Sequence, residues 1–413
     1  MSESTSAPDD SMPCLRRGLQ AFQDHTHPHI LHLYDRFRIA DSLMMSSREL
    51  QIVQLFNGRR TIRDIQSDFM HIERGVTIPE AEVRQLISKL DDRLFLDSPK
   101  LKAFFDEPIR KPSCIGCYPD NPIGIREGLD SLFTRSGGPG LPDPAGSHID
   151  STHPPIRAAL LPHIDYNRGN VSYAWGFKEL IERTNATTFV IIGTSHYSSK
   201  RFSLTRKHFR SPLGLVETDQ KYLDRIVSHH GDGLFDDPLA HIPEHSIELE
   251  VVFLQYLLEK QYSFRIVPLL VGSFGDCVRQ ECSPGQKSDI RRMIEALQFA
   301  EAGAEEEICY LISGDLAHIG PKFDDPQPLS DWQLIHSKKQ DDALIACAES
   351  VDAEGYYRVI ADESDARRIC GLPPTYLTLQ VAKPSRGKLL HYGRYVHPTG
   401  NESVSFASMV FER

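Results

Sequence analysis

Three short apolar segments, each ending in a polar cluster that carries a histidine, constrain the fold of this chain more than any other feature. They span residues 157–163, 189–196 and 310–318, and their histidines are His163, His196 and His318. Apolar runs of this length, bounded by Gly, Pro or Ser, are typical of strands buried on both faces. Because segments of helical pattern separate them, we expect an α/β fold with a mostly parallel sheet. Ligands bind beyond the carboxyl ends of such strands, so the histidines are predicted to share a site.

Length, charge and cysteine usage narrow the class of protein. A chain of 413 residues exceeds the usual size of one domain, so two domains are expected. The net charge of −11 argues against nonspecific nucleic-acid binding and against docking on anionic membranes. The first ten residues contain neither a basic nor an apolar region, and no apolar run approaches the ~18 residues of a membrane span. The eight cysteines are therefore interpreted as reduced thiols, and the protein as cytoplasmic.

The first domain is expected at residues 25–106, after a loose, disordered tail at residues 1–24 with a short helix at 14–22. One or two strands are predicted over residues 37–39 and 43–45. Three helices beginning at Ser46, Thr61 and Thr77 follow, the first with a capping box, and a strand at 94–96 closes the series. Strand, helix, helix, helix, strand is the order of a winged-helix domain.

Residues 34–105 resemble the small peptide-binding domains of the coenzyme PQQ synthesis protein D type. The cue is the segment 55–65, Leu-Phe-Asn-Gly-Arg-Arg-Thr-Ile-Arg-Asp-Ile, which is similar to a turn in those domains. DNA-binding winged helices share this turn, and Arg59, Arg60 and Arg63 could touch phosphate, although neighbouring aspartates oppose that role. Peptide or protein contact, a structural appendage and DNA binding therefore stay as alternatives for this domain.

The second domain is expected at residues 107–413, with a Pro/Gly-rich insertion at about 136–155. Helices are predicted near 174–181, 219–229, 244–258, 288–300, 331–348 and 354–361, with a further buried strand at 264–271 and closing strands at 389–396 and 403–411. Cys114 and Cys117 form a Cys-x-x-Cys pair, which suggests zinc or redox chemistry. A zinc site would need a second such pair, which the sequence lacks, so the two residues are interpreted as a bare structural pair.

Residues at the strand ends supply metal ligands and acid–base groups. His163 and His196 offer neutral imidazoles suited to iron, copper or zinc. Carboxylates in the same stretches come from Asp165, Asp315 and Glu248. Two histidines and a carboxylate suit non-haem Fe(II) and O₂ chemistry, and His245 could transfer a proton or bind substrate. The sequence has no Gly-x-Gly-x-x-Gly, Walker or Gly-x-Ser-x-Gly motif, so neither a nucleotide cofactor nor a hydrolase elbow is expected.

A set of motifs in the second domain resembles the Memo family. They are Pro162-His163, Gly193-Thr-Ser-His196, Glu244-His-Ser-Ile-Glu248, Pro268-Leu-Leu-Val-Gly272, Ser313-Gly-Asp-Leu-Ala-His318, Cys114-Ile-Gly-Cys-Tyr-Pro119, Ile369-Cys-Gly-Leu-Pro-Pro374 and Val404-Ser-Phe-Ala-Ser408. This family includes proteins named AmmeMemoRadiSam system protein B and is related to class III extradiol dioxygenases. The resemblance implies a dioxygenase-like, mostly parallel sheet flanked by helices, here preceded by a small winged-helix-like α+β domain.

The resemblance also implies a site. His163 and His196 would be metal ligands, and His245 would correspond to the acid/base histidine of the dioxygenases. The implied metal is iron (Fe²⁺) or copper. Asp165, Ser195 and Glu248 are expected to line the pocket.

The third ligand is the uncertain part of this implied site. In metal-binding Memo proteins it is a cysteine, and the corresponding position in this chain is interpreted as Ala317. Because alanine cannot bind a metal, the site would hold two histidines only, or be completed by His318 or Asp315.

Two main functions follow. The first is a metal-dependent oxidoreductase, in which Fe(II) would bind O₂ and a diol-like or enol small molecule while His245 moves a proton. The alternative is a non-catalytic adaptor that binds a peptide or partner, motivated by Ala317 and by the peptide-binding-like first domain. A radical SAM enzyme is a third expectation for a partner, implied only by the naming of the family.

Overall fold

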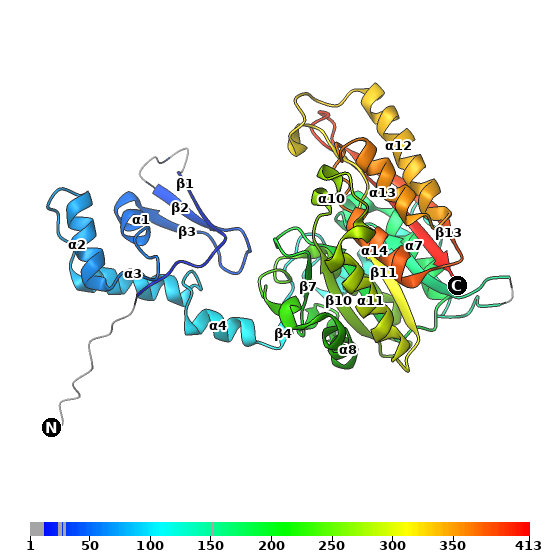
Figure 1. The fold of residues 1–413 in the computed structure, drawn as a ribbon, viewed down its shortest axis with the longest axis horizontal. Helices are drawn as coiled ribbons and strands as arrows, with labels where there is room; N and C mark the ends of the chain where they lie inside the picture. Colours follow the sequence, from blue (N-terminus) through cyan, green and yellow to red (C-terminus); the bar gives the residue numbers. More distant parts are fainter. Residues whose placement is uncertain (1–11, 24–26, 28–29, 151) are drawn as a thin grey trace. The chain divides into compact units, whose positions relative to one another are not determined.

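The computed structural model describes residues 12–23, 27, 30–150 and 152–413 of the chain (Figure 1). The chain divides into two compact units, Met1–Glu107 and Pro108–Arg413. The division falls one residue after the boundary predicted at Asp106. Half of the predicted tail, residues 1–11 and Asp24, lies outside the described residues.

The unit of residues 1–107 combines an antiparallel sheet with a group of helices. Its elements are β1 (Leu19–Gln23), β2 (Ile30–Asp35), β3 (Leu43–Ser46), α1 (Ser47–Val53), α2 (Ile62–Ile72), α3 (Glu80–Asp92) and α4 (Pro99–Asp106), with strand order β1-β2-β3. Capping boxes formed by Ser46 with Glu49 and by Thr61 with Asp64 begin α1 and α2. The apolar faces of these elements enclose a separate hydrophobic core.

Three predictions for this unit are wrong. Residues 14–22 are not a helix in a loose tail: they contain most of β1, which pairs with β2. The predicted strand at 37–39 is a turn, and the one at 94–96 is reduced to an isolated bridge between Leu15 and Leu96. Most of β1 is exposed, so its sequence lacks the alternation that identifies a strand. The described residues therefore form a strand meander followed by helices, without the closing strand of the predicted winged helix.

A mixed sheet of 11 strands is the centre of the unit 108–413. Its order is β12-β14-β5-β11-β6-β10-β9-β8-β4, and β13 and β7 pair with β14 and β10. The strands are β4 (Ile109–Arg110), β5 (Ile156–Leu161), β6 (Thr188–Thr194), β7 (Phe202–Leu204), β8 (His208–Ser211), β9 (Gly214–Thr218), β10 (Arg265–Val271), β11 (Ile308–Ser313), β12 (His318–Ile319), β13 (Arg386–Val396) and β14 (Ser403–Glu412). As predicted, β5, β11, β6 and β10 are parallel neighbours.

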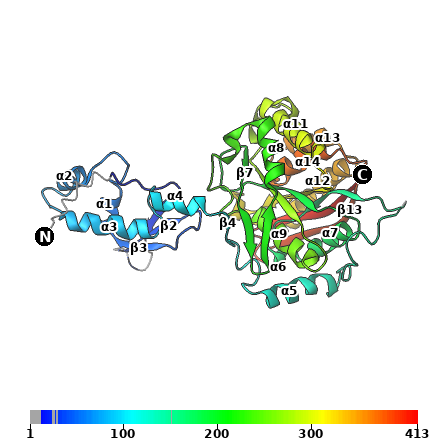
Figure 2. The ribbon, with the colours of Figure 1, turned by 90° about the horizontal axis from the view of Figure 1, so that it is seen from below.

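Helices cover both faces of this sheet (Figure 2). They are α5 (Pro122–Thr134), α6 (Tyr166–Gly169), α7 (Val171–Glu182), α8 (Gln220–His230), α9 (His245–Leu258), α10 (Gly275–Arg279), α11 (Ser288–Ala302), α12 (Asp331–Glu349), α13 (Ala353–Asp362) and α14 (Leu372–Ala382). One hydrophobic core joins the sheet to α5, α7 and α9, and another joins it to α8, α11, α13 and α14. The central strands are therefore buried on both sides, which explains why they read as unbroken apolar runs.

The register of the central strands determines where the histidines lie. Ser313, the last residue of β11, is opposite Leu161 at the end of β5 and Gly193 near the end of β6. The carboxyl ends of the three strands are therefore level, and the residues that follow them meet at one edge of the sheet.

Two features of this unit were not predicted. Residues 201–216 contain β7, β8 and part of β9, and α5 and α14 are additional helices. The interpretation of all eight cysteines as thiols is also wrong, because Cys114 and Cys117 form a disulfide. Gly116, with φ of +107°, lets the chain turn back so that the two Cα atoms come within 5.5 Å.

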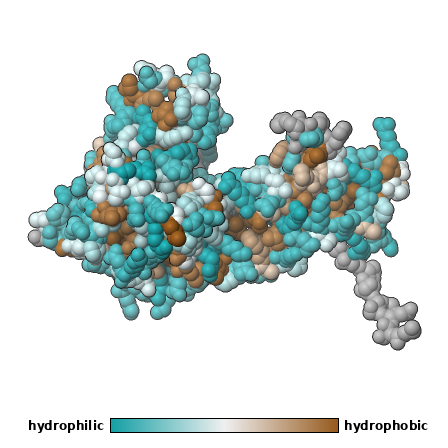
Figure 3. All heavy atoms as spheres, turned by 180° about the vertical axis from the view of Figure 1, so that it is seen from behind, coloured by the Kyte–Doolittle hydropathy of each residue, from teal (hydrophilic) through white to brown (hydrophobic). Residues whose placement is uncertain are grey.

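Figure 3 shows one face on which apolar side chains occur in small groups between hydrophilic ones. No helix among the described residues has the length and apolar character that a bilayer crossing requires.

Candidate functional site

Three histidines from separate parts of the chain lie together beyond the central strands. His163 follows β5, His196 follows β6, and His245 is the first residue of α9. Their ring centroids are 5.1 Å (His163–His196), 5.3 Å (His163–His245) and 4.8 Å (His196–His245) apart, and one ring nitrogen of each lies within 4.8 Å of the others. His163 is buried, whereas the side chains of His196 and His245 are 33% and 29% exposed. These three residues, called the histidine site below, are thus open to solvent on one side.

One buried carboxylate orients two of the three rings. Glu244 caps α9 by accepting from the backbone N–H of Ser246, and it also accepts from the backbone N–H of His196 at 2.8 Å. Its Oε1 lies 2.9 Å from Nδ1 of His196 and 3.3 Å from Nδ1 of His245. Because both Nδ1 atoms are directed to this carboxylate, Glu244 fixes the orientation of the two rings.

A serine orients the third ring. The hydroxyl of Ser313 donates to the backbone oxygen of Ser246 at 2.5 Å, so it can accept only from Nδ1 of His163, which is 3.4 Å away. This arrangement assigns the proton to Nδ1 of His163 and leaves Nε2 as a lone-pair donor. In all three rings of the histidine site, Nδ1 therefore faces a side-chain oxygen, that of Glu244 or of Ser313.

Burial and charge set the protonation of the site. Burial lowers the pKa of His163 to about 3 and that of His245 to about 3, so both rings are neutral near pH 7. Burial would raise the pKa of Glu244, but His196 outweighs this effect and the pKa falls below its usual value. Burial likewise opposes the charged form of His196, yet Glu244 raises the pKa of that ring. Neutral His163 and His245 are in the form that binds metals.

Cys370, which the sequence analysis did not assign to the site, lies directly beside the histidine site. Its Sγ is 3.2 Å from Nε2 of His163, and it forms with His163 and Asp315 a second group whose ligand atoms lie within 4.8 Å of one another. The backbone N–H of Asp315 contacts Sγ at 3.3 Å, and the hydroxyl of Thr194 donates to the backbone oxygen of Cys370. Burial raises the pKa of the Cys370 thiol well above its usual value. The signal available in the sequence was the Ile369–Pro374 motif.

Ala317, the position that was interpreted as that of the third ligand, lies at the edge of the sheet beside β14. Its methyl group is buried, and its backbone N–H and C=O are both bonded to Ser405 of the neighbouring strand β14. Ala317 is thus a packing residue next to the sheet. The thiol comes instead from the loop that precedes α14, more than fifty residues further along the chain.

Two of the residues predicted near the metal have other surroundings. Asp315 accepts from the backbone N–H of His163 at 3.1 Å, and its Oδ2 lies 3.8 Å from Nε2 of that ring. His318 belongs to none of the three groups of ligand atoms found among the described residues. Its Nδ1 lies 3.1 Å from the backbone oxygens of Leu316 and Arg368.

The three residues that were predicted to line the pocket have different environments. Ser195 follows β6, and its buried Oγ has no hydrogen-bond partner among the described residues. Asp165 caps the short helix α6 and forms an ion pair with Arg168. Glu248 is buried and binds Arg110, so its role is to anchor α9.

Another group of ligand-type side chains lies in the Pro/Gly-rich segment. His148 places Nε2 3.0 Å from Asp143 and Nδ1 3.2 Å from Glu182. Lys178 also contacts Glu182 at 2.9 Å. Both ring nitrogens are occupied by carboxylates and a lysine is adjacent, which is the arrangement of a surface ion-pair cluster rather than of a metal site.

Comparisons with known proteins agree with this architecture. A family model described as Memo-like protein matches residues 110–410. A MEMO1 family protein of Aquifex aeolicus is 25% identical over 390 residues, covering 91% of this chain and 94% of the relative. MEMO1 family proteins of Methanopyrus kandleri and Methanobrevibacter smithii are 29% and 28% identical over 313 residues, covering 74% of this chain and 99% and 100% of the relatives. The Aquifex match is longer than the unit 108–413, so it includes part of the first unit.

Proposed function

The chain belongs to the family of Memo-like proteins, and we propose that its histidine site binds a divalent transition metal, iron or copper, for oxidoreductase chemistry on a small molecule. The observation that carries this proposal is the convergence of three oriented imidazoles and one thiol from four separate segments. Side chains this far apart in sequence are brought together at some cost in packing, because they replace apolar groups at the edge of the core.

The donor set fits such a metal. Imidazole suits iron and copper, and a thiolate adds a soft ligand that favours copper or iron over magnesium or calcium. Metal–nitrogen bonds of about 2.1 Å place neighbouring ligand atoms roughly 3.4 Å apart in a tetrahedral site. Ligand atoms within 4.8 Å of one another reach that spacing by small side-chain rotations. His163, His196 and His245 form one candidate ligand set, and His163 with Asp315 and Cys370 forms a second that shares His163.

The proposed chemistry divides between the metal and His245. When bound, the metal would act as a Lewis acid toward an oxygen of the small molecule. His245 would accept a proton on Nε2, since the ring is neutral and its Nδ1 faces Glu244 at 3.3 Å. The negative charge of Glu244 would stabilise the imidazolium formed in this way, as the aspartate does in a Ser-His-Asp triad. Exposure of His245 and His196 provides the access that a substrate needs.

One of the two observations that favoured a non-catalytic adaptor no longer favours it. It rested on the absence of a third ligand at Ala317, and Cys370 supplies a thiol beside His163. The remaining support is the likeness of the first unit to peptide-binding domains. Metal-dependent chemistry is therefore the function that the geometry favours.

The decisive test is an anaerobic titration of the full-length protein with Fe(II), and with Co(II) as a spectroscopic probe. We expect one equivalent of metal to bind wild type and His163→Ala to weaken binding at least about 100-fold, because a direct ligand matters more than its outer partners. Cys370→Ser should abolish the thiolate-to-cobalt charge-transfer band. His148→Ala is the matched control, since it removes the ring of the surface cluster. Equal binding by wild type and His163→Ala, or loss of binding only in His148→Ala, would contradict the proposal.

Glu244 gives a second prediction for the same titration. Glu244→Gln keeps the shape of the side chain but removes the charge that fixes Nδ1 of His196 and His245. Loss of such an outer carboxylate is expected to weaken metal binding about 10- to 100-fold. Glu259→Gln, at the opposite end of α9, serves as the control and should bind as wild type does. Unchanged affinity in Glu244→Gln would show that this carboxylate does not orient the ligands.

A further inference from the structure

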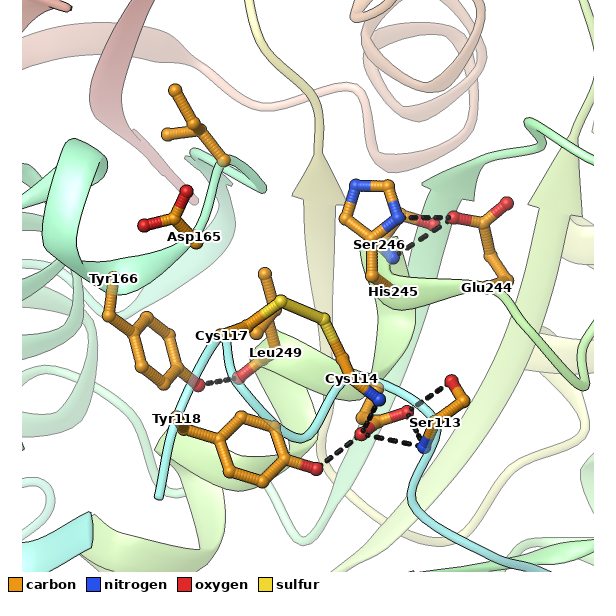
Figure 4. The surroundings of a disulfide bond; sticks show 12 residues. Ser113, Cys114, Cys117, Tyr118, Asp165, Tyr166, Glu244, His245, Ser246 and Leu249 are labelled. Atoms are coloured by element: carbon orange, nitrogen blue, oxygen red, sulfur yellow. Dashed lines mark hydrogen bonds and ion pairs between the residues drawn. A yellow bond between two sulfur atoms is a disulfide. The ribbon is translucent and has the colours of Figure 1, made fainter. Parts of the chain in front are cut away.

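A disulfide-closed turn lies next to the N-terminus of α9. The segment 113–118, called the disulfide turn, is closed by the Cys114–Cys117 bond and by a hydrogen bond from the backbone N–H of Cys117 to the backbone oxygen of Cys114 at 2.9 Å. Figure 4 shows the disulfide between the tyrosines Tyr118 and Tyr166 on one side and His245 with Glu244 on the other. Cys114 is buried and Cys117 is partly exposed, so a reagent in solvent reaches the second sulfur first.

The disulfide turn donates several hydrogen bonds to a single buried carboxylate, that of Glu248. The backbone N–H groups of Ser113 and Cys114 donate to it at 3.0 Å each, and the Ser113 hydroxyl donates at 2.9 Å. The hydroxyl of Tyr118 donates as well. Glu248 therefore accepts from three residues of a segment whose shape depends on the disulfide.

The same carboxylate is connected to the histidine site. Glu248 forms a buried ion pair with Arg110, whose Nη1 is 2.5 Å away. Arg110 also donates to the backbone oxygens of Glu244 and His241, at 2.7 Å each. Glu244 orients two rings of the histidine site, and Glu248 lies one helical turn beyond it on the same face of α9. Arg110 contacts both Glu248 and the backbone oxygen of Glu244. A displacement of the disulfide turn is therefore expected to move Glu244 as well.

We propose that Cys114 and Cys117 are a reversible thiol–disulfide pair whose redox state controls the position of the first turn of α9 and, through it, the histidine site. The metal-affinity part of this inference rests on the proposed function, whereas the structural coupling does not. The thiol pair is outside the histidine site, and neither sulfur belongs to a group of metal-type ligands among the described residues.

The reaction is thiol–disulfide exchange with a low-molecular-weight thiol. An external thiolate attacks Sγ of Cys117, a mixed disulfide forms, and Cys114 leaves as a thiolate that takes up a proton. A second external thiolate attacks the external sulfur of the mixed disulfide, which releases Cys117 and one external disulfide. Two electrons pass from the two external thiols to the protein, and the reverse sequence closes the turn again.

Opening the disulfide changes the hydrogen bonds that the turn donates to Glu248. Two thiol sulfurs separate to van der Waals contact, so the backbone amides of Ser113 and Cys114 no longer have one fixed spacing around the carboxylate. By linkage, any preference of the metal for one redox state must shift the reduction potential of the pair. A tenfold difference in metal affinity corresponds to about 30 mV for this two-electron couple.

The first arm of the test needs no metal. Full-length protein is equilibrated in buffers of reduced and oxidised glutathione or dithiothreitol, alkylated and analysed by mass spectrometry. We expect the peptide containing Cys114 and Cys117 to titrate as one two-electron couple. Ser113→Ala and Glu248→Gln remove contacts that favour the closed turn, so each should ease reduction, about three- to tenfold in the equilibrium constant for one lost hydrogen bond. Glu259→Gln is the carboxylate control on the same helix. Failure to form the disulfide under oxidising conditions, or identical titrations in wild type and both variants, overturns the inference.

The second arm measures the coupling to α9. Amide hydrogen exchange of residues 241–250 is expected to be faster in the reduced protein, while exchange in α11 stays the same. Equal exchange of 241–250 in both redox states overturns the inference. Cobalt titration of the two states then separates the proposals. No binding in either state, with a difference in exchange, rejects the metal function and retains the redox coupling, whereas equal binding with equal exchange rejects the coupling alone.

Discussion

Replacing Glu250 with glutamine is expected to stabilise the unit 108–413 at neutral pH, by an amount that grows as the pH rises. Glu250 lies on α9 and is fully buried, and neither of its carboxyl oxygens has a hydrogen-bond partner among the described residues. A hydrogen bond from Ser313 would lower the pKa of Glu250, but the Ser313 hydroxyl donates to the backbone oxygen of Ser246. Burial, reinforced by the neighbouring charge of Asp315, raises the pKa of Glu250 well above its usual value. The folded protein therefore keeps this acid protonated.

The sign and size of the effect follow from proton linkage. Above pH 4.5 the unfolded chain releases the proton of Glu250 while the folded chain retains it, so the wild type loses stability as the pH rises toward the folded pKa. The loss is at most about 1.4 kcal/mol per pH unit for one proton, between the unfolded and the folded pKa. Glutamine has no proton to lose and is close to the protonated acid in shape. Its advantage over the wild type should therefore be smallest near pH 5 and grow as the pH rises.

Urea unfolding followed by tryptophan fluorescence measures this difference. Both tryptophans, Trp175 and Trp332, belong to the unit 108–413, so the signal excludes the first unit. Glu259→Gln, which alters a partly exposed carboxylate at the end of the same helix, should show no such pH dependence. A difference between Glu250→Gln and wild type that stays constant from pH 5 to pH 8 would contradict a protonated Glu250.

Replacing Arg110 with methionine is expected to lower the free energy of unfolding of the same unit by about 3–5 kcal/mol, the range for breaking one side of a buried ion pair. The side chains of Arg110 and Glu248 are only 1% and 2% exposed. Methionine fills much of the space but leaves the Glu248 carboxylate without its cation, and it removes the hydrogen bonds that Arg110 donates to the backbone oxygens of His241 and Glu244. Such losses of buried hydrogen bonds add to the cost of the uncompensated charge.

A double-mutant cycle separates these contributions. Adding Glu248→Gln to Arg110→Met removes the orphaned charge, so the double variant should be more stable than the sum of the two single effects predicts. Arg126→Met is the matched control because Arg126 pairs with Glu259 at the surface, where ion pairs contribute about 0–1 kcal/mol. Additive effects, or equal losses in Arg110→Met and Arg126→Met, would argue against a buried pair that anchors α9.

The parts of the fold that follow local rules were predictable. The central strands could be recognised because burial on both faces makes them continuous apolar runs, and the helix starting at Ser46 could be recognised because its capping box is local. Strand β1 could not be recognised, since it is exposed and held by pairing with β2 rather than by its own pattern. The same holds for β7 to β9, which are short and depend on neighbouring strands.

Some residues of the candidate site could also be predicted from the sequence, and others could not. His163 and His196 each follow a recognisable strand, so their convergence could be expected from the topology of a parallel sheet. Cys370 could not be placed in this way, because it lies in a loop before an unpredicted helix and reaches His163 only through tertiary packing. The sequence analysis sought the third ligand near the end of β11, where Asp315 does lie. The Cys114–Cys117 disulfide was missed because the two thiols were judged by cellular compartment and not by the turn that Gly116 permits.

The strand β14 has a consequence for the order in which this protein can assemble. All ten of its residues are buried, and it inserts between β12 and β5, the strand that leads to His163. A ribosome-bound chain that ends before Ser403 would therefore expose the edge of β5, although the unit of residues 1–107 could already fold. Pairing across some 250 residues is slow to form, and an open apolar edge invites other chains to pair with it. Protection by a chaperone during synthesis would matter most in that interval.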